Sequence, residues 1–251
     1  MSNNLNPRNE FLDTVRQALR QGADAESADL TETSTPSDDA ADVEARALHV
    51  LEQARSDGET LLARLQESAE KAGCTVVRVK TPQEAGECIQ TVARDLEARS
   101  VVRSIHDILD RTDVDAVLSA DGVQVVLMAQ EGDSDKESQR QSLRERAAGA
   151  DIGITGVDYA IAETGSCVIV PRAGVSRLVS LLPPVHIAVV EAGQVLPSLD
   201  DLFLLRRRDF LQGELGSYMS IISGPSRSAD IEYTIVKGVH GPGEVHLVLL
   251  G

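Results

Sequence analysis

The strongest constraint on the fold is a repeated alternation between helical periodicity and short apolar runs. A helical pattern of apolar residues extends from Asp42 to Lys71 and ends at Gly73, a residue that suits a helix stop. The next run, residues 74–79, is typical of a strand, and Pro82 then begins a second helical pattern. This order predicts an α/β fold with a mostly parallel sheet flanked by helices.

The same alternation continues to the end of the chain. Further strand-like runs lie at residues 101–102, 116–118, 123–129, 152–155, 167–170, 186–190, 220–223 and 245–250, with helical stretches near 137–148 and 200–211. Short glycine-rich loops end many of these runs. Because ligands of open α/β sheets bind beyond the carboxyl ends of the strands, we expect the functional site at that edge.

The chain divides into three parts by composition. Residues 1–22 form a predicted N-terminal helical arm, in which apolar residues recur at helical spacing between Phe11 and Leu19. Residues 23–42 are acidic and rich in alanine, serine and threonine. They bury too little apolar area to offset ordering entropy, so this part is predicted to be a flexible linker. Residues 43–251 form the predicted α/β domain.

Net charge and aromatic content narrow the range of partners. The formal charge of −16 repels a phosphate backbone, and three Phe and three Tyr leave little for stacking on bases, which argues against nucleic acid. No charged leader with an apolar stretch opens the chain, and no uncharged apolar run approaches the ~18 residues of a membrane span. We therefore expect a soluble, cytoplasmic protein without a membrane span.

The three cysteines, Cys74, Cys88 and Cys167, are isolated from one another. Their odd number and spacing fit a reducing compartment and argue against a disulfide framework. No CxxC pair is present, so we expect this chain alone to hold no cysteine-ligated iron–sulfur cluster and no metal. The HExxH, GxSxG, Walker A and GxGxxG motifs are absent as well.

The segment that follows the strand-like run 220–223 is the first candidate binding site. Ser223 and Gly224 allow a sharp exit from the strand, and Ser226 or Ser228 is predicted to cap a helix that extends to residue 237. A helix N-terminus offers unpaired N–H groups and a favourable dipole to an anion. The sequence therefore predicts an anion site at this corner.

Arg227 gives this predicted site its positive charge. Its guanidinium is a bidentate fork for a carboxylate or a phosphate. In the alternative interpretation the serines only cap the helix, and Arg227 pairs with Asp230 one turn further on. The residues themselves leave both interpretations open.

His240 and Gly241 lie in a second glycine-rich loop, just before the terminal strand-like run. A histidine in such a loop can serve as an acid, a base or a hydrogen-bond donor near neutral pH. The alternative is a surface turn histidine. His186, by contrast, is predicted to cap a strand, and His246 alternates with apolar residues, which indicates a structural role.

Glu163, Thr164 and Gly165 form the third candidate site. In one interpretation Asp158 caps a short helical turn and Glu163, the lone acid of an apolar stretch, acts as a base or nucleophile. In the other, these residues form an ordinary hairpin turn between two strands. The hairpin interpretation is slightly favoured by the residues alone.

Four motifs together resemble one known family. They are ITGVDYAIAETG at 154–165, LPPVHIAVV at 182–190, ISGPSRSADIE at 222–232 and GVHGP at 238–242. They closely resemble the lactate utilisation protein C family, whose conserved unit is also called the LUD domain. The likeness spans about residues 43–251 and is most specific in the C-terminal hundred residues.

This resemblance implies a fold similar to ribose-5-phosphate isomerase, glucosamine-phosphate deaminase and CoA transferases. It also implies work with partner subunits, at least one bearing iron–sulfur clusters, in oxidising L-lactate to pyruvate. This chain then resembles the cluster-free member, and what it contributes chemically is left open. The residues implied for a ligand pocket are Glu163, Thr164, Gly165, Ser223, Gly224, Ser226, Arg227, Asp230, His240 and Gly241.

Three functions follow as hypotheses. The first is a subunit that binds a small carboxylate, or supports assembly, in an iron–sulfur-linked lactate oxidation system. The alternative is a stand-alone enzyme of the isomerase or CoA-transferase type, with Glu163 as base or nucleophile and the Ser226–Arg227 corner holding phosphate. The third is a scaffold without a small ligand.

Overall fold

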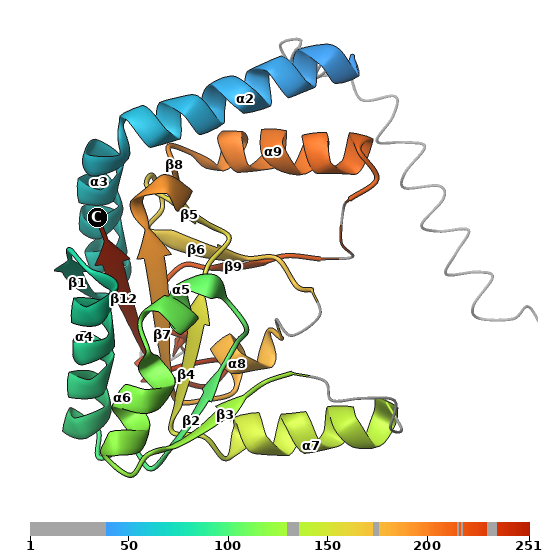
Figure 1. Cartoon of the computed structure of the whole chain (residues 1–251). Coiled ribbons are helices and arrows are strands. Elements are labelled where there is room, and N and C mark those ends of the chain that lie inside the picture. The colour runs from blue at the N-terminus through green and yellow to red at the C-terminus, as the bar shows by residue number, and fades with distance from the viewer. Residues whose placement is uncertain (1–38, 130–135, 173–175, 215, 217, 230–234) are drawn as a thin grey trace, which may run out of the picture. The chain divides into compact units, whose positions relative to one another are not determined.

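Six parallel strands form the central sheet of this computed structural model (Figure 1). In spatial order they are β1 (Thr75–Val79), β12 (Glu244–Leu250), β7 (Val185–Glu191), β4 (Ile152–Gly156), β2 (Ser100–Arg103) and β3 (Gln124–Leu127). Each neighbouring pair is parallel, so the predicted α/β fold with a mostly parallel sheet is confirmed. The terminal strand β12 inserts between β1 and β7, which makes the last residues part of the core.

The structure describes residues 39–129, 136–172, 176–214, 216, 218–229 and 235–251. The predicted helical arm at residues 1–22 and nearly all of the predicted linker lie outside this range. The described chain from Ala40 to Gly251 forms one unit. Its first helix begins at Ala40, two residues before the start that the periodicity predicts.

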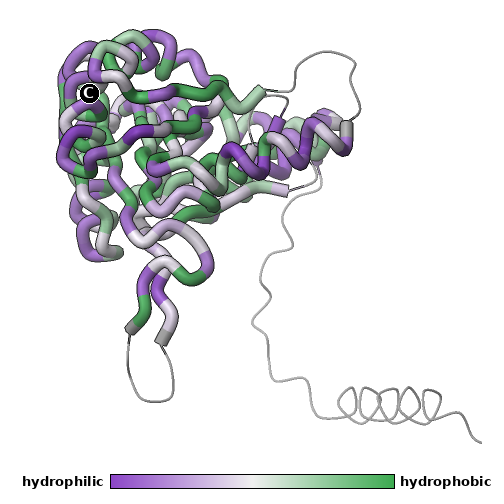
Figure 2. The backbone as a smooth tube through the Cα atoms, turned by 90° about the horizontal axis from the view of Figure 1, so that it is seen from below, coloured by the Kyte–Doolittle hydropathy of each residue, from purple (hydrophilic) through white to green (hydrophobic). Residues whose placement is uncertain are grey.

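Helices cover both faces of the central sheet (Figure 1). One side carries α4 (Pro82–Asp95), α5 (Asp107–Arg111) and α6 (Val114–Ala120), and the other carries α2 (Ala40–Ser56), α3 (Gly58–Ala72), α7 (Lys136–Ala148) and α8 (Leu178–Leu181). On that second side α9 (Leu199–Leu211) packs against α2. Strand β7 shows how the faces divide: Ile187 and Val189 pack toward α4–α6, while Ala188 and Val190 pack toward α2 and α3. A strand that is buried on both faces has a nearly continuous apolar sequence. Figure 2 shows such hydrophobic stretches of the backbone inside the domain.

A second, four-stranded sheet lies between the central sheet and α9 (Figure 1). Its order is β8 (Val195–Leu196), β5 (Tyr159–Ile161), β6 (Ser166–Ile169) and β9 (Ser220–Ile222), with the 3-10 turn η1 (Ala192–Gln194) before β8. A separate antiparallel ribbon pairs β10 (Arg227–Ala229) with β11 (Ile235–Lys237). The segments that carry the candidate site residues all belong to these smaller elements or their connections.

Two element predictions are wrong for local reasons. The helix predicted over 42–71 is two helices that meet at Asp57, because Gly58 weakens a helix interior. The strand predicted at 116–118 is part of α6, in which Val114 and Leu118 are buried one turn apart and Ala116 is exposed. The predicted stop at Gly73 is confirmed, since it adopts φ 94° and closes α3 with bonds to Ala69 and Glu70.

The start of α4 supports a first prediction. The Thr81 hydroxyl accepts a hydrogen bond from the Glu84 N–H at 3.2 Å, and the Glu84 carboxylate accepts one from the Lys80 N–H at 2.8 Å. We expect Thr81→Ala to lower the free energy of unfolding by about 1 kcal/mol in chemical denaturation, because the cap is lost. Thr81→Ser should keep most of it, and equal stability of all three proteins would contradict the capping role.

No helix within the described ranges is long and apolar enough to cross a membrane.

Candidate functional site

The candidate residues gather around two places, the C-terminal end of α3 and the loop before β12. The turn from Glu163 to Gly165 joins β5 to β6, which confirms the hairpin interpretation and excludes a helical turn capped by Asp158. Glu163 is exposed there, and its N–H donates to the Pro197 carbonyl at 3.2 Å.

A chain of three hydroxyl groups links the β5–β6 turn to the end of β9. Thr164 Oγ1 lies 2.7 Å from Ser166 Oγ, and Ser166 Oγ lies 2.7 Å from Ser223 Oγ. Ser166 is buried and Ser223 is exposed, so the chain runs from the interior to the surface. Ser166 was not among the predicted residues. Its contact with Ser223 depends on the pairing of β6 with β9, and residue spacing alone does not predict that pairing.

Two predicted glycines allow close contact with α3. A side-chain carbon on Gly165 would lie 2.3 Å from the Ala69 nitrogen, and one on Gly224 would lie 2.6 Å from the Ala72 carbonyl oxygen. Both glycines also have positive φ, 68° and 95°. Close packing and backbone conformation therefore account for glycine at both positions, whatever ligand role they have.

The environment of Arg227 differs from the one predicted. Residues 227–229 and 235–237 are the strands β10 and β11, so the helix predicted to run from Ser226 or Ser228 to residue 237 is wrong. Cross-strand pairing prevails over the local capping signal here. Asp230, the predicted i,i+3 partner of Arg227, lies outside the described residues.

The guanidinium of Arg227 lies at the end of α3. Its Nη2 donates to the Ala72 carbonyl at 2.9 Å and covers Gly73. A helix C-terminus leaves carbonyl groups without partners in the helix, and a cation there is favourable. Burial raises the pKa of the adjacent Cys74 thiol to about 11, although the nearby positive charge of Arg227 acts in the opposite direction.

Arg227 faces a second cation across the ribbon. In the β10–β11 register Arg227 pairs directly with Lys237, and both side chains are exposed. Residues directly opposite in an antiparallel pair have Cβ atoms about 5 Å apart, and like charges there repel. Local patterns could not predict this second cation, because the register depends on pairing between residues ten positions apart.

The His240 loop is hydrogen-bonded to Ser226, next to the start of the ribbon. The Ser226 hydroxyl accepts a hydrogen bond from the His240 N–H at 3.1 Å, and the Ser226 N–H donates to the Pro242 carbonyl at 2.8 Å. The His240 side chain is exposed, and Gly241 lies next to Ser226 and Leu181. The two glycine-rich loops, 14 residues apart at Ser226 and His240, therefore form one corner.

A cavity of about 500 Å³ opens beside this corner. It is lined by Leu182, Pro184, Val185, Lys237, Gly238, Gly241, Gly243 and Glu244. Val185 and Glu244 begin β7 and β12, so the cavity lies at the amino edge of the central sheet. The expectation that the glycine-rich loops lie beyond the carboxyl ends is wrong for this loop, because it precedes β12.

The carboxyl edge carries a polar group that the sequence reasoning missed. The His106 ring packs over Gly156, where a side chain would lie 2.2 Å from the ring, and His106 Nδ1 accepts from the Ile108 N–H at 3.3 Å. Arg103, 7% exposed, pairs with Asp115 at 2.6 Å. The position of Arg103, directly after the apolar run 101–102, is the sequence signal that could have indicated this polar group.

Metal-binding chemistry finds little support in the described part of the chain. No group of three or more His, Cys, Asp or Glu side chains there is placed to hold a metal ion. Burial raises the pKa of Cys74, Cys88 and Cys167, which disfavours the thiolate form that binds metals.

Comparison with known proteins adds family information to this geometry. A family model described as the LUD domain matches residues 62–250. Lactate utilization protein C of Halalkalibacterium halodurans is 34% identical over 157 residues, which cover 62% of this chain and 64% of that protein. Lactate utilization protein B of Geobacillus kaustophilus is 28% identical over 234 residues, covering 75% and 48%.

The chain thus spans between about half and two thirds of these relatives. Among solved structures, the crystal structure of a DUF162 family protein from Deinococcus radiodurans aligns with a TM-score of 0.49 and 18% identity. That alignment covers 77% of this chain and 98% of the other.

Proposed function

This chain belongs to the LUD domain family, and from that premise we propose that it serves in lactate utilisation as a subunit that binds a small carboxylate. Two relatives carry the name lactate utilization protein, one of type C and one of type B.

The observation that carries the proposal is the opposed pair of cations on the β10–β11 ribbon. In a chain with a formal charge of −16, Arg227 and Lys237 stand directly opposite each other. A carboxylate placed between them relieves their repulsion and accepts charge-assisted hydrogen bonds from the guanidinium fork. Lactate and pyruvate each offer one such group.

The neighbouring corner supplies the remaining chemistry in this proposal. His240, joined to the ribbon through the Ser226 hydroxyl, is exposed beside the cavity that Lys237 and Glu244 line, and it is assigned hydrogen bonding or proton transfer to the ligand hydroxyl. Thr164 and Ser223 extend the polar lining along the hydroxyl chain. Glu163 keeps its proposed acid–base role only if the ligand reaches the β5–β6 turn.

Electron transfer is assigned to other chains. Oxidation of lactate releases two electrons and two protons, and we propose iron–sulfur clusters on partner subunits as their acceptor. The cysteine spacing supports this division, because Cys74, Cys88 and Cys167 are isolated from one another and form no CxxC pair.

Calorimetric titration of the purified full chain with L-lactate and with pyruvate tests the binding site. We expect Arg227→Ala to weaken binding about 10- to 100-fold, which corresponds to the loss of one charged hydrogen-bonding group. Lys237→Gln should weaken it by a smaller factor. Arg227→Lys should recover only part of the loss, because an ammonium group lacks the planar fork.

Arg64→Ala is the matched control, since Arg64 is an exposed arginine on α3 away from the ribbon. It should bind both acids as the wild type does. Unfolding midpoints measured alongside separate loss of binding from loss of fold. If Arg227→Ala binds both acids with unchanged affinity, the site is wrong.

A further inference from the structure

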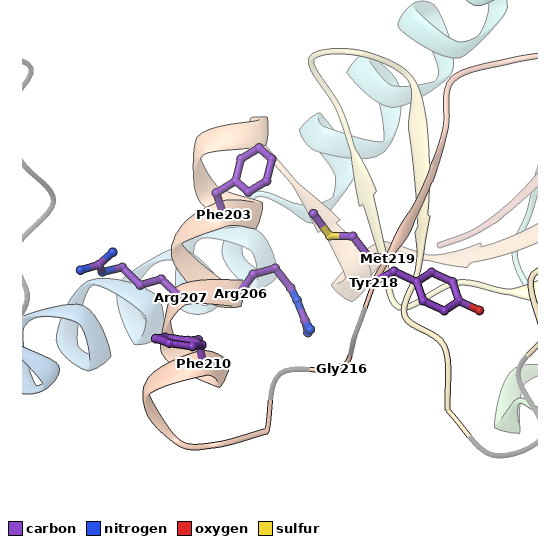
Figure 3. Close-up of a pocket in the computed structure, with 7 residues that line it drawn as sticks. All are labelled: Phe203, Arg206, Arg207, Phe210, Gly216, Tyr218 and Met219. Atoms are coloured by element: carbon purple, nitrogen blue, oxygen red, sulfur yellow. The ribbon is translucent and has the colours of Figure 1, made fainter. Parts of the chain in front are cut away.

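An open groove of about 460 Å³ lies between α9 and the segment before β9 (Figure 3). Its lining residues are Phe203, Arg206, Arg207, Phe210, Gly216, Tyr218 and Met219. Figure 3 shows Arg206 extending from α9 toward the segment that carries Tyr218 and Met219. None of these residues belongs to the carboxylate site proposed above.

Aromatic residues are concentrated on this groove and remain in contact with water. Phe203 is 53% exposed, Phe210 63% and Tyr218 42%, and the chain has only six aromatic residues. Leaving large apolar side chains in water costs burial energy of about 25 cal/mol per Å², so a contiguous set of them marks an interaction surface. The groove therefore needs an occupant with an apolar side chain.

The charges of the lining define that occupant further. Both charged residues of the lining, Arg206 and Arg207, are cationic; Arg206 already pairs with the buried Asp209 at 2.7 Å, so the charge offered to a partner is that of Arg207. The Arg177 guanidinium also lies 5.2 Å from the centre of the Tyr218 ring. The groove thus fits a helix that carries an apolar ring next to a carboxylate.

The N-terminal half of α9 has this chemistry. Asp200 and Phe203 are exposed and lie one turn apart, and Arg207 follows two turns after Asp200 on the same side. Seven residues span ~10 Å along a helix. If a second α9 lies antiparallel to the first, Asp200 of each copy meets Arg207 of the other and the phenylalanines meet between them.

We propose that this groove is the contact between two copies of the chain, related by a twofold axis with their α9 helices antiparallel. Such a contact uses the same patch on both copies, so each favourable pair occurs twice.

Sedimentation velocity of the full chain between about 1 and 200 µM tests the contact. The wild type should shift from the monomer mass of 26.8 kDa to about twice that value as concentration rises. Phe203→Glu and Phe210→Glu should stay monomeric throughout. Leu96→Glu, an exposed apolar position just after α4 on the other side of the sheet, should dimerise as the wild type does. A monomeric wild type at all concentrations overturns the proposal.

A charge exchange tests the antiparallel arrangement. Asp200→Arg and Arg207→Glu should each be monomeric alone, since like charges then meet at both ends of the contact. Mixed together they should form a heterodimer, because both contacts become attractive again. Equal unfolding midpoints establish that both variants are folded, and a mixture that stays monomeric excludes this geometry.

Discussion

Replacement of Gly165 by alanine is expected to lower the free energy of unfolding by roughly 3–5 kcal/mol. The added carbon would lie 2.3 Å from the Ala69 nitrogen and 2.5 Å from the Ser68 carbonyl carbon. Both are backbone atoms of α3 and cannot rotate away. Gly165 also has φ 68°, which costs a non-glycine residue a further amount. The β5–β6 turn must therefore separate from α3.

Chemical denaturation of Gly165→Ala beside Gly193→Ala measures this effect. Nothing lies within 4 Å of a side chain on Gly193, and its φ is not positive, so that control should change stability by about 0.5 kcal/mol or less. A Gly165→Ala protein as stable as the control would show that the turn yields without cost.

Acid should destabilise the fold through His186, and this is the second large effect. Burial lowers the pKa of His186 to about 4, with a smaller contribution from His246, against 6.5 for the model compound. The ring is fully buried on β7, with Nε2 2.9 Å from Thr155 Oγ1 and Nδ1 without a hydrogen-bond partner in the described structure. Protonation would leave a positive charge in this environment.

The direction follows from proton linkage. Below pH 6.5 the unfolded chain takes up a proton at this histidine that the folded chain refuses, so stability falls as the pH drops from 6.5 toward 4. At 1.36 kcal/mol per pKa unit the loss is about 3 kcal/mol across that window. Above pH 6.5 the ring is neutral in both states and contributes no slope.

His186→Gln isolates this contribution, because an amide keeps a hydrogen-bonding group near Thr155 but does not titrate. Unfolding free energies between pH 4.5 and 7.5 should vary less for this variant than for the wild type. His49→Gln removes an exposed histidine on α2 and should keep the wild-type slope. Parallel curves for wild type and His186→Gln would contradict the assignment.

Periodicity predicted the fold because the central strands and helices carry their signal locally. Strands buried on both faces are apolar throughout, and α4 has its cap, its Pro82 start and its apolar stripe in one stretch. The prediction failed at residues 226–237, where serine at a strand exit looks like a helix cap. Pairing of residues 227–229 with residues 235–237 makes these residues a ribbon, and such pairing has no local signature.

The candidate site was predicted in its parts but not in its arrangement. Motif likeness selected Ser226 and His240, and the structure confirms that their loops touch. The motif likeness did not predict the contact of Arg227 with the Ala72 carbonyl, and it did not include Ser166 or Lys237. Each of these contacts joins elements far apart in the chain, and residue spacing contains no information about such distances.

The hydrogen bond from Arg227 to the last turn of α3 affects how tightly this side chain can bind a ligand. A guanidinium has five N–H donors, and the Ala72 carbonyl accepts from one of its nitrogens. Most of the donors can therefore still bind a ligand. A long side chain that is already held in one rotamer has lost much of its conformational entropy before a ligand binds. Preorganisation of this kind lets a very small acid, with few atoms to contribute, bind without first ordering its receptor.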